Sequence, residues 1–125
     1  ELRRDGLEVD RWNRLNPGKE AKKTWTQTML GDSKTPIIAV SDNMAAVPDM
    51  VRKWMPENFE VLGTDGFGRS DTREALRRFF EIDGVAVTLA ALSQLVRKGD
   101  IEASVYQKAA KKFGISTKRN DITEL

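Results

Sequence analysis

Histidine and cysteine are both absent from this 125-residue chain. Without histidine there is no Ser–His or Cys–His nucleophile pair, no imidazole general base and no ordinary zinc site. Without cysteine there is no disulfide and no thiolate metal ligand. We therefore expect the chain to contribute no acid–base machinery of its own to any reaction in which it takes part.

A long hydrophobic run and a dominant sign of charge are also missing. No apolar run of about 18 residues is apparent, so we expect no membrane-spanning helix, and no signal peptide is visible. The chain has 21 Lys and Arg against 19 Asp and Glu, a formal net charge of +2. The basic residues are spread along the sequence, whereas a nucleic-acid-binding surface usually gathers them on one face. We therefore do not expect nucleic acid as a partner.

Hydrophobic periodicity predicts alternating helices and strands. The short apolar runs at 37–40 and 59–62 are typical of parallel strands buried on both faces. Helices are predicted at 1–15 (weakly, because Gly6 interrupts the pattern), 24–30, 43–54, 71–79, 84–98 and 101–113, with Asp83 and Gly99 capping the fifth. The residues expected on core-facing sides are Met44, Val47, Val51, Trp54, Val105, Ala109 and Phe113. Trp25, Met29 and Leu30 share one face of their helix, and the tryptophans are expected to be core or interface residues.

This alternation indicates an α/β layer architecture. Two strands alone do not make a stable parallel sheet, so we expect the domain to be incomplete on its N-terminal side. We expect residues 1–115 to form this domain and residues 116–125 to form a polar tail.

The most distinctive segment is the glycine-rich turn at residues 62–73, between the second strand and a helix. Its spacing, Gly-x-x-Gly-x-Gly, differs from the dinucleotide-binding and P-loop patterns, and Asp65 places a carboxylate where a phosphate would lie. We therefore predict a structural or interface turn rather than a phosphate cradle, with a capping box of Asp71 and Glu74. The candidate interface residues are Gly63, Asp65, Gly66, Phe67, Gly68, Arg69 and Asp71.

Charged residues around this turn allow two further interpretations. Four arginines near the next helix could bind an anion or a partner, but an equal number of carboxylates lies nearby, and pairing with them is the preferred explanation. The two sets are Arg69, Arg73, Arg77 and Arg78, and Asp65, Asp71, Glu74 and Glu81.

Three carboxylates, those of Asp42, Asp65 and Asp71, could meet at the strand ends, where open α/β sheets usually carry function. No spacing fixes them together as a magnesium site. Helix capping explains Asp42 and Asp71 at least as well.

Several blocks of the sequence resemble one family. The turn reads Leu-Gly-Thr-Asp-Gly-Phe-Gly-Arg-Ser-Asp, which is long enough to make chance a poor explanation. The other blocks are Arg3-Arg4-Asp5-Gly6, Arg11-Trp12-Asn13-Arg14-Leu15, Ser41-Asp42-Asn43-Met44 and Phe80-Glu81-Ile82-Asp83. From about residue 1 to residue 113 the chain is similar to the C-terminal domain of the homodimeric pyruvate dehydrogenases of bacteria, the thiamine-diphosphate-dependent component of their complex.

The resemblance implies a three-layer α/β/α transketolase C-terminal-like fold around a mostly parallel sheet with one antiparallel strand. It implies a cytoplasmic parent enzyme that decarboxylates pyruvate and passes the acetyl unit to a lipoyl group. In that family the two preceding domains bind thiamine diphosphate and Mg²⁺, so this chain is expected to bind neither and to carry no catalytic residue. The implied partners are the rest of the same enzyme, its homodimer mate and the lipoyl acetyltransferase component.

Two other interpretations stay open. The parent could be another enzyme of the transketolase superfamily, or the chain could be a stand-alone regulatory or binding module with the same fold. The complete reading frame and an assay of pyruvate decarboxylation would separate these interpretations.

Overall fold

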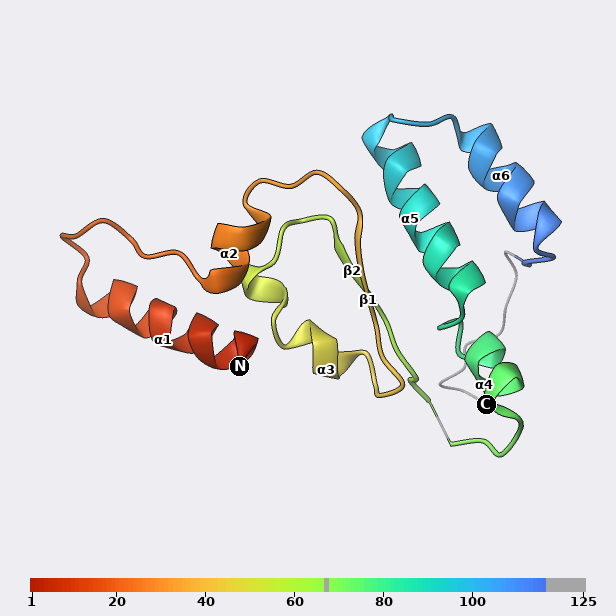
Figure 1. Cartoon of the computed structure of the whole chain (residues 1–125), viewed down its shortest axis with the longest axis horizontal. Coiled ribbons are helices and arrows are strands. Elements are labelled where there is room, and N and C mark those ends of the chain that lie inside the picture. The colour runs from red at the N-terminus through yellow and green to blue at the C-terminus, as the bar shows by residue number, and fades with distance from the viewer. Residues whose placement is uncertain (67, 117–125) are drawn as a thin grey trace.

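The computed structural model describes residues 1–66 and 68–116. α1, α2 and α3 lie on one side of the two strands, and α4, α5 and α6 lie on the other (Figure 1). Phe67 and residues 117–125 of the expected polar tail lie outside the described residues. The elements are, in chain order, α1 (Leu2–Leu15), α2 (Trp25–Leu30), β1 (Ile37–Val40), α3 (Ala46–Asp49), the 3₁₀ helix η1 (Arg52–Trp54), β2 (Phe59–Leu62), α4 (Arg73–Phe79), α5 (Gly84–Lys98) and α6 (Ala103–Lys112).

The two strands begin and end at the residues predicted from the sequence. They pair in parallel, with Ile37 opposite Phe59 and Val40 opposite Leu62, so the α/β class is confirmed. Within residues 1–66 and 68–116 the sheet contains only these two strands, and the expected antiparallel strand is not among them. The strands are also less covered than expected, because the helices of the described residues leave part of the sheet open: Val40 is 43% exposed.

α1 packs its glycine against a tryptophan of η1. Gly6 is buried, and a Cβ built on it would stand 2.4 Å from two ring atoms of Trp54. Trp54 itself is only 6% exposed. The sequence pattern predicts an interruption at Gly6, but the helix continues through it, because the missing side chain leaves the space that the indole fills.

A charged contact beside this pair also joins α1 to η1. Nζ of Lys53 lies 2.6 Å from Oδ2 of Asp10. This ammonium group, and after it the Trp54 indole, holds the pKa of the Asp10 carboxyl below its usual value. The buried indole N–H of Trp54 lowers this pKa as well, although it makes no hydrogen bond of standard geometry.

Acid is expected to weaken the contact between α1 and η1. Folding lowers the pKa of Asp10, so the ionised carboxylate stabilises the fold above the unfolded-state pKa. This contribution is lost as the pH falls through the lower pKa of the folded state. Asp10→Asn removes the titration, so the urea unfolding midpoint of the variant should depend less on pH between about 2 and 5 than that of the wild type. Equal pH dependence in the two proteins would contradict this assignment.

α2 begins at a capping box. The backbone N–H of Gln27 donates to Oγ1 of Thr24 (3.1 Å), and the backbone N–H of Thr24 donates to Oε1 of Gln27 (2.9 Å). Thr26 is buried, and its hydroxyl donates to the carbonyl of Trp54 (3.2 Å). Trp25 and Met29, which share the apolar face identified in the sequence, are 57% and 62% exposed, because the threonine face of this short helix meets η1.

Two shorter pieces, α3 and η1, replace the helix predicted at 43–54. Between them the backbone forms i to i−3 hydrogen bonds, as in a 3₁₀ helix; the N–H of Val51, for example, donates to the carbonyl of Pro48 (3.3 Å). Pro48 has no N–H to continue the ladder of a regular α-helix. Trp54 faces the core as predicted, but Met44 and Val47 do not, since they are 56% and 42% exposed.

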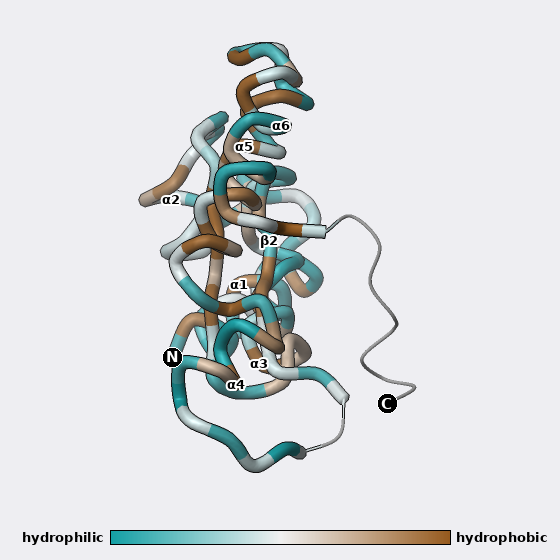
Figure 2. The backbone as a smooth tube through the Cα atoms, turned by 90° about the vertical axis from the view of Figure 1, so that its right-hand side faces the viewer, coloured by the Kyte–Doolittle hydropathy of each residue, from teal (hydrophilic) through white to brown (hydrophobic). Residues whose placement is uncertain are grey.

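In the C-terminal half, α5 packs against β1 and α6, and hydrophobic residues recur along it (Figure 2). As predicted, Asp83 caps α5 by accepting from the N–H of Ala86 at 2.8 Å, and Gly99 ends it with a φ of +83°. α6 turns Ala110 inward. Val105 and Phe113, predicted to face inward, are instead 44% and 37% exposed.

Within the helical residues Arg73–Lys98 of the described part of the chain, one 18-residue window is long and apolar enough to cross a membrane, with a mean hydropathy of 1.5. This corrects the expectation that no such apolar window exists. The segment is divided into α4 and α5 by a turn at residues 80–83, in which Glu81 has a φ of +56°. Because α5 also packs against β1, the test is weak evidence for a membrane.

Candidate functional site

The glycine-rich turn ties the carboxyl end of β2 to the segment that follows β1. The backbone N–H of Thr64 donates to the carbonyl of Asn43 (3.0 Å), and its hydroxyl donates to the carbonyl of Asp42 (2.9 Å). The N–H of Ser41 donates in turn to the carbonyl of Leu62 (3.0 Å). These bonds hold residues 41–43 and 62–64 side by side at one end of the sheet.

Two glycines of the turn have a clear physical reason. A Cβ at Gly63 would lie 2.4 Å from the nitrogen and 2.7 Å from the Cα of Ala45, and 2.9 Å from the carbonyl oxygen of Asn43. Gly66 has a φ of +100°, a conformation that residues with a side chain adopt only at a cost. At Gly68, by contrast, a Cβ would meet nothing within 4 Å. Close approach explains the first glycine, and backbone conformation explains the second.

The carboxylate of Asp65 has a role within the fold. Its Oδ1 accepts from the N–H of Ala45 at 3.1 Å, which satisfies a free donor just before α3. Asp42, which was expected to cap this helix, does not do so, and Oγ of Ser41 accepts instead from the N–H of Asn43 (3.0 Å). Because the carboxylate of Asp65 already accepts a backbone N–H here, the structure favours a structural turn over a phosphate-binding loop.

Arg69 and Asp71 lie on the exposed side of the turn. Cζ of Arg69 is 4.1 Å from the ring centroid of Phe79, within the range of a cation–π contact. Oδ1 of Asp71 accepts from the N–H of Thr72 (2.7 Å), and Oγ1 of Thr72 accepts from the N–H of Ala75 (3.3 Å). Thr72 therefore caps α4, one residue after Asp71. The prediction of a capping box formed by Asp71 and Glu74 is wrong.

Two arginines of α4 join this helix to other segments of the chain. Nη2 of Arg77 lies 3.4 Å from Oδ2 of Asp42, so it joins α4 to the end of β1. Arg78 lies 3.2 Å from a carboxylate oxygen of Asp83, and its Nη2 donates to the carbonyl of Phe113 (2.8 Å). Neither Asp42 nor Asp83 belongs to the four carboxylates that local charge counting suggests, which are Asp65, Asp71, Glu74 and Glu81.

A hollow of about 460 Å³ lies between the turn and α4. Its lining includes Arg69 and Arg73 together with Asp42 and Asp71, so charges of both signs face it. Among residues 1–66 and 68–116, no group of three or more acidic side chains could hold a metal ion. The magnesium site considered from the sequence is therefore not formed by Asp42, Asp65 and Asp71.

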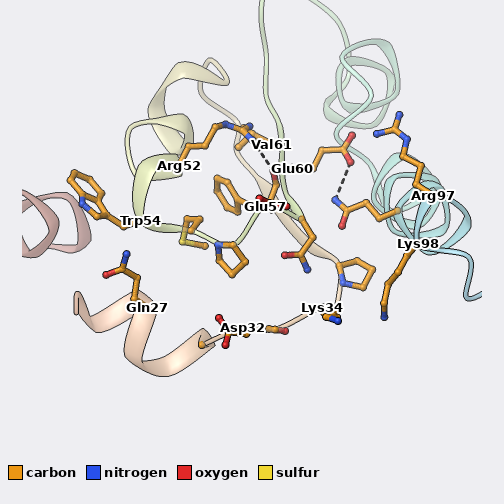
Figure 3. Close-up of a pocket in the computed structure, with 18 residues that line it drawn as sticks. Gln27, Asp32, Lys34, Arg52, Trp54, Glu57, Glu60, Val61, Arg97 and Lys98 are labelled. Carbon is orange, nitrogen blue, oxygen red and sulfur yellow. Dashed lines mark hydrogen bonds between the residues drawn. The ribbon is translucent and has the colours of Figure 1, made fainter. Parts of the chain in front are cut away.

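A larger groove, of about 1010 Å³, lies near the amino ends of the strands, between α2, η1, β2 and α5 (Figure 3). Nη1 of Arg52 donates to the carbonyl of Phe59 (2.8 Å), and the side-chain amide of Gln94 donates to Glu60 (3.1 Å). The sequence does not reveal this groove, because its lining comes from separate segments. Charges of both signs line it: Lys34, Arg52, Arg97 and Lys98, and Asp32, Glu57 and Glu60.

Comparisons with known proteins agree with the resemblance seen in the sequence. A family model described as a transketolase-like TK C-terminal domain matches residues 7–83. The chain is 50% identical over 124 residues to the pyruvate dehydrogenase E1 component of Pseudomonas aeruginosa, a match that covers 98% of this chain and 14% of that protein. The E1 components of Corynebacterium glutamicum and Escherichia coli K12 are 44% identical over 112 residues and 41% identical over 116 residues.

These two matches cover 90% and 92% of this chain, but only 12% and 13% of the relatives' own length. The family match contains the sheet, the glycine-rich turn and α4. The two parallel strands with helices on both sides agree with this fold. The chain belongs to the transketolase-like C-terminal domain family.

Proposed function

We propose that this chain is the C-terminal region of a bacterial, cytoplasmic pyruvate dehydrogenase E1 component that depends on thiamine diphosphate. The complete enzyme decarboxylates pyruvate and transfers the acetyl unit to the lipoyl group of the acetyltransferase component. The observation that carries this proposal is the 50% identity to the Pseudomonas aeruginosa E1 component over 98% of the chain. The chain spans a small part of such proteins, so the reaction is that of the whole enzyme.

Residues 1–115 act in this proposal as a supporting domain, and thiamine diphosphate and Mg²⁺ bind elsewhere in the enzyme and its homodimer. The chemistry of the residues supports this division. The sequence has no histidine, and two carboxylates of the turn already accept backbone N–H groups, Asp65 from Ala45 and Asp71 from Thr72. When bound, thiamine diphosphate supplies the stabilisation of the carbanion. In this proposal the residues of this chain support the structure of the enzyme and do not take part in the reaction.

The outer side of the glycine-rich turn is proposed to contact the rest of the enzyme. The inner side is fixed by the close approach of Gly63 to Ala45, so the exposed residues that follow are presented on a rigid base. Preorganised surfaces bind with a smaller loss of conformational entropy. Of the candidate interface residues, Gly63 and Asp65 hold the inner side, and the proposed contact residues in the described part of the turn are Gly66, Gly68, Arg69 and Asp71; Phe67 lies outside the described residues.

An assay of the full-length enzyme tests the proposed function. We expect pyruvate decarboxylation and acetylation of a lipoyl domain when thiamine diphosphate and Mg²⁺ are supplied, and neither reaction without them. Decarboxylation of 2-oxoglutarate or ketol transfer in place of these reactions would assign another enzyme of the transketolase superfamily. A reading frame that encodes only this domain would indicate a stand-alone binding module.

A further inference from the structure

We propose that an exposed apolar surface around α3 docks onto another part of the same polypeptide, outside these 125 residues. This inference rests on the proposed function, because it requires the longer enzyme. The surface, called the α3 surface below, consists of Val40, Met44, Val47 and Met50.

The α3 surface is apolar and half open to solvent. Its four side chains are 43%, 56%, 42% and 52% exposed, in chain order, and lie within eleven consecutive residues. Met44, Val47 and Met50 recur every third residue along helical hydrogen bonds, which places them on one side of this segment. Single exposed apolar side chains are common, whereas a contiguous group is typical of an interaction site. Two of the four are methionines, whose flexible side chains adapt to the shape of a partner.

The backbone beneath the α3 surface is held in place by the glycine-rich turn. The carboxylate of Asp65 accepts from the N–H of Ala45 (3.1 Å), and the N–H of Thr64 donates to the carbonyl of Asn43 (3.0 Å). Gly63 allows the two segments to approach this closely. The segment that carries the α3 surface is therefore joined to the inner side of the turn.

The charges near the α3 surface point to a partner that is apolar and close to neutral. Asp42 and Asp49 lie beside it, and each is paired, with Arg77 at 3.4 Å and with Arg52 at 2.6 Å. Each of these carboxylates is therefore balanced by an arginine, which favours neither an anionic nor a basic partner. An apolar patch with a polar rim is the usual anatomy of a protein–protein contact.

Size favours the same polypeptide over a second copy of the chain. A stable interface between separate proteins buries about 800 Å² on each partner, which is more than four half-exposed side chains provide. A small surface is sufficient when a covalent connection keeps the partner at high effective concentration. The relatives supply such a connection, since this stretch makes up only 12–14% of their length.

Val105 offers a matched control. It is 44% exposed, against 42% for Val47, but it lies on α6, on the other side of the strands (Figure 1). Its neighbours along α6 are Ser104 and Tyr106, and the residues one turn further on are Lys108 and Ala109. Glutamate at position 47 or 105 therefore adds the same charge at nearly equal exposure. The proposal distinguishes the two positions because another part of the polypeptide covers Val47 but not Val105.

The test compares Val47→Glu with Val105→Glu in the full-length enzyme, with the rate of limited proteolysis under native conditions as the readout. We expect Val47→Glu to raise the cleavage rate at least about tenfold, as for a buried contact at the centre of an interface. Val105→Glu should change the rate by less than about twofold. Equal effects of the two substitutions would overturn the proposal.

A photo-crosslinking residue at position 47 identifies the occupant and does not depend on how the glutamate variant folds. We expect a crosslink within one chain, to a peptide outside residues 1–125. A crosslink between two chains would assign the surface to a second copy and overturn the proposal, as would the absence of any crosslink. An intrachain crosslink in an enzyme that does not decarboxylate pyruvate would leave this inference intact and refute only the proposed function.

Discussion

Gly63→Ala is expected to destabilise the domain by about 3 kcal/mol or more. The new Cβ would stand 2.4 Å from the nitrogen and 2.7 Å from the Cα of Ala45. These are backbone atoms, so no side chain can rotate to make room. The turn and the segment before α3 would have to separate, with loss of the hydrogen bonds that Thr64 and Asp65 make across them. Urea unfolding followed by far-UV circular dichroism measures the loss.

Gly68→Ala is the control within the same turn. A Cβ at Gly68 meets nothing within 4 Å, so the free energy of unfolding should change by less than about 1 kcal/mol. If Gly63→Ala and Gly68→Ala cost the same, close approach at Gly63 is not what the turn requires. The description of the turn as a clamp between the strand ends would then be wrong.

Gly6→Ala is expected to cost about 2 kcal/mol, although alanine is the better helix former. Placing alanine in a helix interior gains about 1 kcal/mol over glycine. Against this gain, the Cβ would stand 2.4–2.6 Å from ring atoms of Trp54, whose 6% exposure leaves the indole no open side to move into. Overpacking of this kind costs about 1–3 kcal/mol, occasionally more, and here it outweighs the propensity.

Gly84→Ala tests the same substitution without the steric conflict. Gly84 is the first residue of α5, and a Cβ there meets nothing within 4 Å. The variant should be neutral or more stable by up to about 1 kcal/mol. A Gly6→Ala variant at least as stable as the wild type would show that the indole does not occupy the space beside α1.

Local signals predicted the elements of this fold well. Both strands were placed to the residue, because short runs of β-branched and aromatic residues between turn signals leave few other assignments. Asp83 and Gly99 were identified as the caps of α5, since capping depends on residues within one turn of the helix end. The prediction of an α/β class follows from the same local pattern.

Inner faces of the short helices were predicted poorly, because they depend on contacts between distant segments. α2 has only six residues, too few for periodicity to decide, and it buries Thr26 because that hydroxyl reaches the carbonyl of Trp54. Gly6 reads as a break in a helix until the indole beside it is known. Propensity is a weak prior that such tertiary contacts override.

The candidate site was predicted in outline but not in its contacts. The prediction of a structural turn follows from the glycine spacing and from the carboxylate of Asp65, but the backbone N–H that this carboxylate accepts does not. The partner of Asp65 is Ala45, and the partner of Arg77 is Asp42. Ala45 lies 20 residues before Asp65, and Asp42 lies 35 residues before Arg77, so nothing in local spacing indicates these contacts. The assignment to the transketolase-like family came instead from the long motif as a whole.

Titration of thiamine diphosphate with Mg²⁺ tests most directly whether this domain supports chemistry that takes place elsewhere. Isothermal titration calorimetry measures binding of the cofactor to the full-length enzyme and, separately, to the folded 125-residue chain. We predict saturable binding to the full-length enzyme and no binding to the chain alone. Tight binding to the chain alone would contradict the proposed division between this domain and the rest of the enzyme.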